Sequence, residues 1–310
     1  MTIKKYEFTG ETKNFNGITL KRIRRISDGA IGGWIENEGN LSHEGECFVF
    51  GEAVVYGEAR VCGEARVFGE ARVFDEAVVY GKAVVCGEAE VCGKAVVCGK
   101  AVVCGEAEVC GKAVVCGKAE VYGEARVFDE AEVYGEARVY GEAEVCGEAR
   151  VYGEARVYGE AVVYGEAEVY SEAEVYGEAR VYGEAVVYGE ARVYGEARVY
   201  GEAVVYGKAE VYGKARVSKG TVNGKVALPF KFIFQLQCQQ RMLTAILTET
   251  DEILYSIGCQ TNITKETFLD RIQNENGGLN KNSHRHEYLI VMELVENYFN
   301  QMKTEYSQEG

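Results

Sequence analysis

Apolar and polar positions alternate along most of this chain with a period of two, inside a longer period of six. From Gly45 to Ser218 the unit Gly-Glu-Ala-x-Val-Tyr recurs in 29 successive hexads without an insertion. The third position is Ala except at Cys47, and the fifth is Val in every hexad. Residues two apart in a strand point to the same side, so Ala and Val should face inward and x and Tyr outward. The Gly-Glu pair is predicted to form a corner, because Gly accepts backbone angles that other residues resist.

A slower rhythm predicts how many hexads make one coil. Residues 87–104 return at 105–122 with two changes, and Asp75 and Asp129 lie three such 18-residue steps apart. A two-sided coil of 12 residues is disfavoured, because a shift of 12 mismatches the charged positions. Short strands bury an apolar face only when copies stack. The sequence therefore predicts a mainly β fold, a left-handed parallel β-helix: a three-sided β-solenoid with 18 residues per coil, nearly ten coils and a length of ~45 Å.

The two ends of the chain depart from the repeat. Residues 1–44 alternate like strands and are predicted to form an N-terminal β cap, which would cover the open edges of the first coil. Residues 45–218 form the solenoid, and residues 219–310 are predicted to form a small C-terminal α+β domain. In that domain we expect two strands flanking Glu249 to Glu252 and a helix starting at Thr264. A second, amphipathic helix carries its apolar face on Tyr288, Val291, Met292, Val295, Tyr298, Phe299 and Met302.

A basic run in the N-terminal segment has two interpretations. Lys21, Arg22, Arg24 and Arg25 follow one another closely and could form a nucleic-acid patch. The segment as a whole sums to only +1, which favours a solvated strand face instead.

Charge is concentrated in the solenoid. The chain has a formal net charge of -15, and the repeats hold 32 acidic and 18 basic residues. An acidic rod repels phosphate, so no direct binding of nucleic acid is expected. Arginines at the x position, such as Arg126, Arg180 and Arg198, are expected to reach the neighbouring Glu rows.

Stacking at 18 residues gathers one unbroken column of carboxylates about 4.8 Å apart. Lysines interrupt the other two corners, but this one ends only at Lys214. Like charges at that spacing cost stability unless something screens them, so the column is the candidate site for a protein partner. Its members are Glu52, Glu70, Glu88, Glu106, Glu124, Glu142, Glu160, Glu178 and Glu196.

Residues 76–116 are the least polar part of the predicted surface. An exposed apolar belt more often marks an interface than a solvated surface, so we expect a homo-oligomer here, a dimer or trimer. The candidate self-association residues are Val78, Val84, Val96, Val102 and Val114. The Tyr ladders predicted on the faces, such as the column from Tyr122 to Tyr212, either add lateral packing or offer a platform to bases or a partner's side chains.

Eight of the 11 cysteines occupy the position where Tyr or Phe otherwise stands, which indicates apolar filling. The stacked pairs Cys86/Cys104, Cys92/Cys110 and Cys98/Cys116 have a strand spacing compatible with the Cα separation of a disulfide. The sequence shows no signal-like or membrane-spanning apolar run, so a cytoplasmic location with free thiols is expected, in the host cytoplasm if the protein is phage-encoded.

Two non-repeating segments carry a family resemblance. The segment "GITLKRIRRISDGAIGGWIENEGNLSHEGECFVF", followed by "GEARVYGEA" repeats, resembles the YdcK-like hexapeptide-repeat proteins of bacteria and phages, which are often labelled acyltransferases. The tail, with "ILYSIGCQTNITKETFLDRI" and "HEYLIVMELVENYF", is similar to the short α/β ending of phage-borne members. The resemblance implies a left-handed β-helix, frequently a trimer, and a phage or prophage origin.

Catalysis is not expected from this sequence. The resemblance to acyltransferases implies a His acting as general base between coils, and no His lies between Gly45 and Ser218. His284, His286 and Cys259 lack the second ligand pair that a metal site needs, so neither a metal nor a cofactor is expected. No catalytic residue is assigned.

The expected function is that of a non-enzymatic acidic rod that binds a host protein. One form of this hypothesis is a phage inhibitor that mimics nucleic-acid charge toward a defence or nucleic-acid-binding protein, although ~4.8 Å between charges does not match the ~3.4 Å rise of a duplex strand. The alternatives are an acyltransferase of the hexapeptide-repeat class and a passive self-assembling scaffold.

Overall fold

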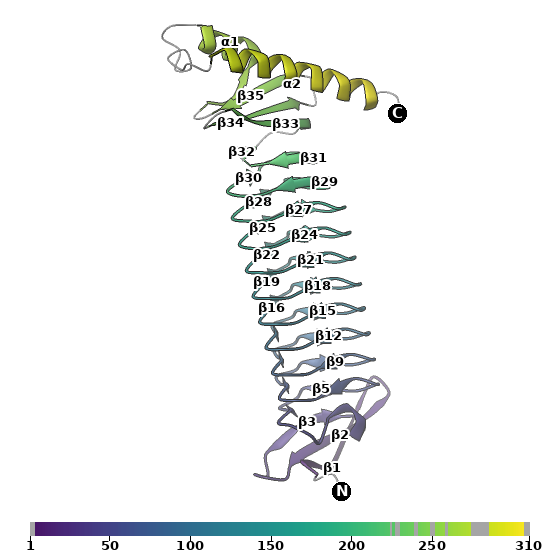
Figure 1. The fold of residues 1–310 in the computed structure, drawn as a ribbon. Helices are drawn as coiled ribbons and strands as arrows, with labels where there is room; N and C mark the ends of the chain where they lie inside the picture. The colour runs from purple at the N-terminus through teal and green to yellow at the C-terminus, as the bar shows by residue number, and fades with distance from the viewer. Residues whose placement is uncertain are drawn as a thin grey trace.

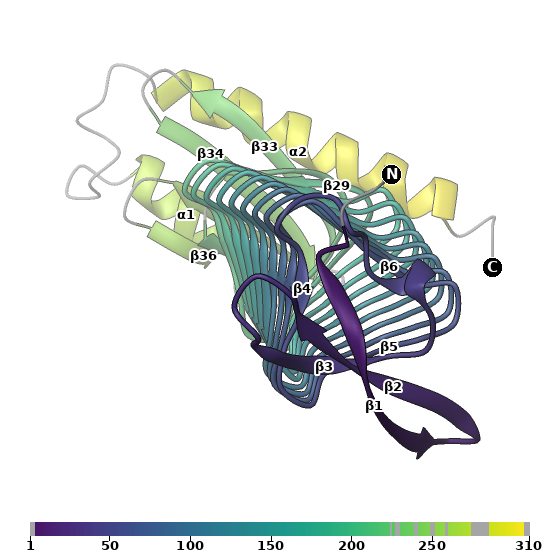
Figure 2. The ribbon, with the colours of Figure 1, turned by 90° about the horizontal axis from the view of Figure 1, so that it is seen from below.

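The computed structural model describes residues 4–223, 225–226, 230–238, 241–248, 252–257, 260–273 and 285–306. These residues form a rod of stacked coils with a capping segment at each end (Figure 1). Viewed along the rod, successive coils repeat the same outline, each slightly offset from the one before (Figure 2). Strands pair in parallel with the strand 18 residues further on, as in Tyr140 with Tyr158, so the 18-residue coil is confirmed.

Each coil contributes one strand to each of three parallel stacks, which form three faces. The first face holds β4 (Phe48–Val49), β7 (Arg66–Val67), β10 (Val84–Val85), β13 (Val102–Val103), β16 (Glu120–Gly123), β19 (Arg138–Gly141), β22 (Arg156–Gly159), β25 (Glu174–Gly177), β28 (Arg192–Gly195), β30 (Glu210–Val211) and β32 (Lys225–Val226). The second face holds β5 (Val54–Val55), β8 (Arg72–Val73), β11 (Glu90–Val91), β14 (Glu108–Val109), β17 (Arg126–Val127), β20 (Glu144–Val145), β23 (Val162–Val163), β26 (Arg180–Val181), β29 (Arg198–Val205) and β31 (Arg216–Val222). The third face holds β6 (Arg60–Val61), β9 (Val78–Val79), β12 (Val96–Val97), β15 (Val114–Val115), β18 (Glu132–Val133), β21 (Arg150–Val151), β24 (Glu168–Val169) and β27 (Val186–Val187), and then the second half of β29.

The interior of the rod consists of the Ala and Val positions. From Ala53 to Val217 these side chains are buried, nearly all with no exposed surface, and they join one continuous core cluster. Backbone hydrogen bonds run along the rod from coil to coil, as from the Arg138 N–H to the Ala155 carbonyl at 2.9 Å. The predicted inward direction of Ala and Val is confirmed.

The N-terminal segment covers the first coil. β1 (Tyr6–Phe15) and β2 (Ile18–Arg25) form an antiparallel pair, and β3 (Ile31–Ile35) pairs antiparallel with β2 but parallel with β5. Parallel stacking therefore begins at Trp34, upstream of the first regular hexad. A short 3-10 helix, η1 (Glu38–Asn40), follows.

The C-terminal segment is a four-stranded antiparallel sheet with two helices. The sheet contains β33 (Phe230–Cys238), β34 (Arg241–Thr248), β35 (Ile253–Ile257) and β36 (Gln260–Thr264), followed by α1 (Lys265–Gln273) and α2 (Arg285–Tyr306). The predicted hairpin and both helices are confirmed, and the Thr264 hydroxyl accepts from the Thr267 N–H at 3.4 Å.

The two faces of this sheet have different neighbours. Leu243 and Tyr255 pack against the helices, whereas Ile246 and Leu254 belong to the core cluster of the solenoid. On α2 the predicted apolar face is buried at Tyr288, Val291, Met292, Val295 and Phe299, and Tyr298 packs against the same cluster. The side chain of Met302 lies outside the described residues. Neither helix is long and apolar enough in its described residues to cross a membrane.

Candidate functional site

The corner between the first and second faces carries the predicted column of carboxylates and is called the Glu corner. A groove of about 870 Å³ runs along this corner. It is lined by Gly and its following residue in seven successive coils, from Gly105 and Glu106 to Gly213 and Lys214. Six of the nine predicted partner-binding carboxylates line it: Glu106, Glu124, Glu142, Glu160, Glu178 and Glu196. The structure therefore places the predicted column beside a hollow, which the sequence pattern did not indicate.

The lining of the groove includes bare backbone for a steric reason. Gly141, for example, has a φ of +74°, and a Cβ there would lie 3.0 Å from the backbone nitrogen of Gly159. The Glu142 N–H donates to the Gly159 carbonyl at 2.9 Å, so backbone polar groups along this corner bond one another. The side chains available to a ligand in the groove are therefore the carboxylates and Lys214.

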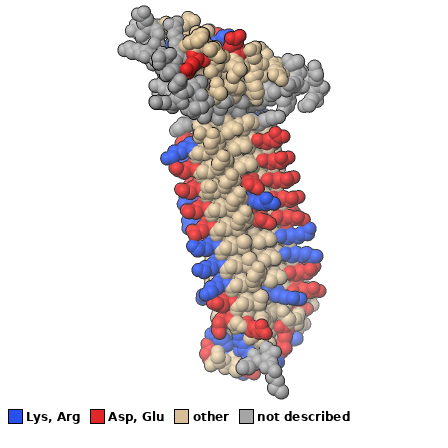
Figure 3. All heavy atoms as spheres, in the orientation of Figure 1, with Lys and Arg blue, Asp and Glu red and all other residues tan. Residues whose placement is uncertain are grey.

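Charges on the other two corners are largely paired where lysine is present. Figure 3 shows charged side chains gathered along both edges of the third face, in runs of acidic groups and runs of basic groups. The ion pairs on these corners are Lys82–Glu64 at 3.3 Å, Lys94–Glu76 at 3.6 Å, Lys112–Glu130 at 2.6 Å, Lys118–Glu136 at 2.7 Å and Lys208–Glu190 at 3.4 Å.

The Glu corner has ion pairs at its two ends. Lys214 pairs with Glu196 at 3.7 Å, and Glu52 is bound by the N-terminal segment. The seven carboxylates from Glu70 to Glu178 form no ion pair with any residue that the structure describes. A continuous row of about 29 Å, at ~4.8 Å per coil, is therefore left to solvent or a ligand.

The N-terminal segment closes one end of this row. Glu52 accepts from the Trp34 indole N–H at 3.0 Å and pairs with Arg22 at 3.3 Å and Lys13 at 3.5 Å. The hydrogen bond from Trp34 is the main reason that the pKa of Glu52 is lowered.

The arginines of the basic run form ion pairs with carboxylates of the N-terminal cap and the first coil. Besides the contact of Arg22 with Glu52, Arg24 pairs with Glu7, and Arg25 pairs with Asp28 at 2.6 Å. Arg25 holds the pKa of Asp28 at about 2, mainly by this hydrogen bond. The arginines of the run are thus paired with the protein's own carboxylates.

Arginines on the faces do not neutralise the Glu corner. Arg126 pairs with Glu108 at 3.8 Å and Glu144 at 3.5 Å, which occupy the same x position one coil away on either side. The expectation that Arg126, Arg180 and Arg198 reach the Glu rows is wrong: Arg180 and Arg198 stack in register with each other and form no ion pair within the described residues. In-register stacking makes an adjacent x residue the nearest neighbour.

A ladder of six Tyr rings runs along the first face, next to the Glu corner in sequence. From Tyr122 to Tyr212 neighbouring ring centroids lie 4.8–5.3 Å apart and the planes differ by 1–9°. Partial burial raises the pKa of Tyr158 to about 12. Because neighbouring rings occupy each other's faces, the geometry supports the lateral-packing interpretation rather than a platform for bases.

The predicted self-association residues lie on two faces. Val78, Val96 and Val114 are on the third face and Val84 and Val102 on the first, all half-buried. Lys82, Lys100 and Lys118 form the corner between them. The apolar belt is therefore two strips separated by a row of lysines.

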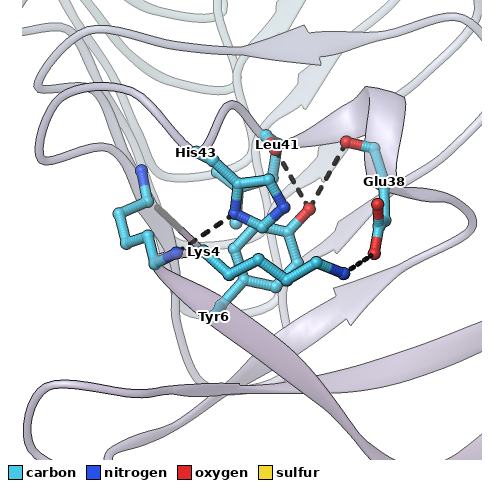
Figure 4. Close-up of polar contacts among 6 residues, drawn as sticks. Lys4, Tyr6, Glu38, Leu41 and His43 are labelled. Atoms are coloured by element: carbon cyan, nitrogen blue, oxygen red, sulfur yellow. Dashed lines mark hydrogen bonds and ion pairs between the residues drawn. The ribbon is translucent and has the colours of Figure 1, made fainter. Parts of the chain in front are cut away.

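His43 lies in the N-terminal cap, on a cavity of about 390 Å³ that Lys4, Lys5 and Cys47 also line. Its ring stacks on Tyr6 at 4.3 Å, and the Tyr6 hydroxyl donates to the Leu41 carbonyl at 3.0 Å (Figure 4). Its Nδ1 accepts the backbone N–H of Lys5 at 3.2 Å, which assigns the ring proton to Nε2. The ring therefore has no free basic nitrogen in this arrangement.

The other predicted candidates do not assemble into a site. His284 and Cys259 lie outside the described residues, and His286 is exposed on α2. No group of three or more His, Cys, Asp or Glu side chains suited to a metal occurs in the part of the chain that the structure describes.

Comparison with known families identifies the repeat. The family model for the YdcK beta solenoid repeat matches residues 149–165 and 191–207. In these two segments the chain is similar to the YdcK beta solenoid repeat. Both matched segments include groove-lining residues, Gly159 and Glu160 in one and Gly195 and Glu196 in the other. A search of curated protein sequences found no match. The resemblance to YdcK-like proteins is thus confirmed in these two segments of the repeats.

Proposed function

We propose that this YdcK-type solenoid is a non-catalytic rod that binds a basic protein surface along the Glu corner. The observation that carries the proposal is the row from Glu70 to Glu178, seven carboxylates without an ion pair among the described residues, of which five line the groove. Ordered rows of one charge raise the local concentration of oppositely charged partners and speed their association.

The partner that fits this row best is a protein with a basic cleft of the kind that holds nucleic acid. The carboxylates are presented on a rigid backbone, so binding orders few groups on the rod. In a phage or prophage setting, which the YdcK-like resemblance implies, occupation of such a cleft would inhibit a host defence or nucleic-acid-binding protein. The charge spacing does not copy a duplex, so recognition rests on the row as a whole.

An acyltransferase activity has less support. Of the described histidines, His286 lies on α2 outside the solenoid, and the Lys5 amide occupies the Nδ1 of His43. The groove of the Glu corner is lined by glycines, carboxylates and Lys214, and no histidine, serine or cysteine lines it.

A charge-matched pair of variants tests the proposal. The corner variant carries Gln in place of five carboxylates of the row, at Glu88, Glu106, Glu124, Glu142 and Glu160. The control variant carries Gln at five carboxylates of the other corners that also have no ion pair among the described residues: Glu148, Glu154, Glu166, Glu172 and Glu184. Both variants lose the same net charge, so a difference between them reports position.

The primary measurement is fluorescence anisotropy with labelled decalysine at low and moderate salt. We expect the corner variant to bind about tenfold more weakly or worse, because exposed ion pairs contribute roughly 0.2–1 kcal/mol each. The control variant should lose less than about threefold in affinity for decalysine. Equal losses would assign binding to net charge alone and contradict a site on the Glu corner.

A second measurement addresses the partner class. Host proteins captured by the native rod and lost with the corner variant are tested for release of labelled duplex DNA when the rod is added. Release supports the basic-cleft partner. A native rod that binds neither decalysine nor host protein and sediments as an oligomer would support the scaffold alternative.

A further inference from the structure

Three pairs of cysteines stack directly across neighbouring coils. Register places Cys86 above Cys104 on the first face, since Val85 pairs with Val103 and the Cys86 N–H donates to the Val103 carbonyl at 2.9 Å. Cys92 with Cys110 on the second face, and Cys98 with Cys116 on the third, repeat this arrangement. All six thiols are free and half-buried.

The distance between side chains stacked at this position of the repeat can be taken from the Tyr rings that stand there in other coils. Stacked Tyr rings at the same position in later coils lie 4.8–5.0 Å apart in most pairs, with nearly parallel planes. Parallel side chains at that spacing exceed the ~3.8 Å Cβ separation typical of a disulfide. A zinc–thiolate bond is about 2.3 Å, so two metal–sulfur bonds of similar length in line span ~4.6 Å, close to the spacing of the columns.

We propose that each stacked thiol pair is a two-coordinate site for a soft monovalent cation of the Cu(I) class. Soft thiolate ligands select Cu(I), whereas zinc and iron–sulfur clusters require four ligands. The described residues offer no group of three or more metal-ligating side chains, so each pair supplies two thiolates and no more. Binding replaces two S–H protons by two S–Cu bonds, the protons pass to solvent, and nothing is oxidised.

Neighbouring charges rank the three sites. A bis-thiolate Cu(I) unit carries a charge of -1, which nearby cations favour. Lys100 and Lys118 follow Cys98 and Cys116 two residues later, with uncharged Val96 and Val114 beside them. The pair on the third face should therefore bind most tightly.

The other two pairs have less favourable surroundings. Lys94 and Lys112 follow the second-face pair, but Glu90 and Glu108 stand beside it at the x position. Glu88 and Glu106 follow the first-face pair, so this pair should bind most weakly.

The chain supplies its own control cysteines. Cys62 and Cys146 occupy the same position of the repeat, but their neighbours in the columns one coil away are aromatic: Tyr80 for Cys62, and Phe128 and Tyr164 for Cys146. They should contribute to no two-coordinate site. A Cys→Ser change at either position removes one thiol, as each change in the stacked pairs does, and so serves as a matched control.

The test is an anaerobic titration of the full-length chain with Cu(I) against a chromophoric Cu(I) chelator. A variant with Cys86→Ser, Cys92→Ser and Cys98→Ser should lose three equivalents relative to the native chain, and the variant with Cys62→Ser and Cys146→Ser should lose none. Single variants should remove the tightest equivalent at Cys98 and the weakest at Cys86. Circular dichroism confirms that each variant is folded.

Two results would overturn the proposal. One is an equal loss of copper in the triple and control variants. The other is X-ray absorption of the loaded chain showing nitrogen ligands or three or more sulfurs per copper. A sulfur-only, two-coordinate spectrum from a chain whose sedimentation is unchanged by copper supports it, because it excludes bridging between copies.

Discussion

The N-terminal coils, residues 76–116, and the C-terminal coils, residues 120–212, share one interior and differ outside. Ala and Val are buried in both. Outward positions in the N-terminal coils hold mostly Val, Cys and Lys, and those in the C-terminal coils mostly Tyr, Arg and Glu. The comparison shows that the inward positions specify the coil and leave the outward positions free to vary.

The largest expected effect tests whether the interior is uniform. Val85→Ala and Val139→Ala remove fully buried side chains at equivalent positions of the first face, one in each region. Each should destabilise its region by about 2 kcal/mol, from lost burial and a small cavity. Urea unfolding measures both. Values more than about 1 kcal/mol apart would mean that the two interiors are not equivalent.

A smaller effect should separate the two exteriors. Tyr158 stacks on Tyr140 and Tyr176 at 4.8 and 4.9 Å, so Tyr158→Ala removes two aromatic contacts. We expect a loss of about 1.5 kcal/mol, since aromatic pairs contribute roughly 0.5–1.5 kcal/mol each. Cys104→Ala, on the same face, should cost less than half as much. Equal costs by urea unfolding would mean that the ladder adds nothing beyond covering the coil.

The smallest effect is a difference in alkaline stability. Burial raises the pKa of Cys86 to about 11 and of Cys92 to about 12 from ordinary values near 9, and raises the pKa of Tyr158 to about 12 from near 10. Folding therefore favours the protonated form of these groups. Their contribution to the free energy of unfolding is complete at pH values below the pKa in the unfolded state, and it is lost as the pH rises toward the pKa in the folded state. The N-terminal coils, which hold several such thiols, should weaken more from about pH 9. The C-terminal coils hold one, Cys146, whose pKa burial raises to about 11, and should weaken mainly from about pH 10.

Urea midpoints at pH 8, 9 and 10 check this difference. A variant with Cys86→Ser and Cys92→Ser should keep more of its pH 8 stability at pH 10 than the native chain does. If the urea midpoint falls equally in the variant and in the native chain, the thiols are not the cause of the alkaline loss of stability.

The regular part of the fold was predictable because its signal is repeated. Each of 29 hexads restates the inward Ala and Val, so the three-sided, 18-residue coil follows from the sequence, and period-two and period-3.6 patterns gave the C-terminal hairpin and helices. The aperiodic N-terminal segment has no such redundancy. Trp34 and Glu52 are 18 residues apart, the length of one coil, but the hexad pattern does not extend to Trp34, so it could not place this contact. That Trp34 pairs with Val54, and that Arg22 binds Glu52, depend on contacts whose spacing is not that of the coil.

The candidate site was predictable in composition but not in shape. The column of carboxylates follows from stacking at 18, whereas the hollow beside it depends on how the Gly backbone turns at each corner. The pairing of Arg126 within its own column was missed, because sequence spacing gives the row of a side chain but not the direction in which a long side chain extends.

The three-hexad coil also limits how this molecule can change its length by gene duplication. Gain or loss of 18 residues lengthens or shortens the rod by one coil and keeps every column in phase. Gain of a single hexad rotates everything beyond it by a third of a turn. The row beginning at Glu70 would then continue over a corner that carries lysines, and the Tyr ladder would break between faces. Natural length variants of this rod should therefore differ in steps of 18.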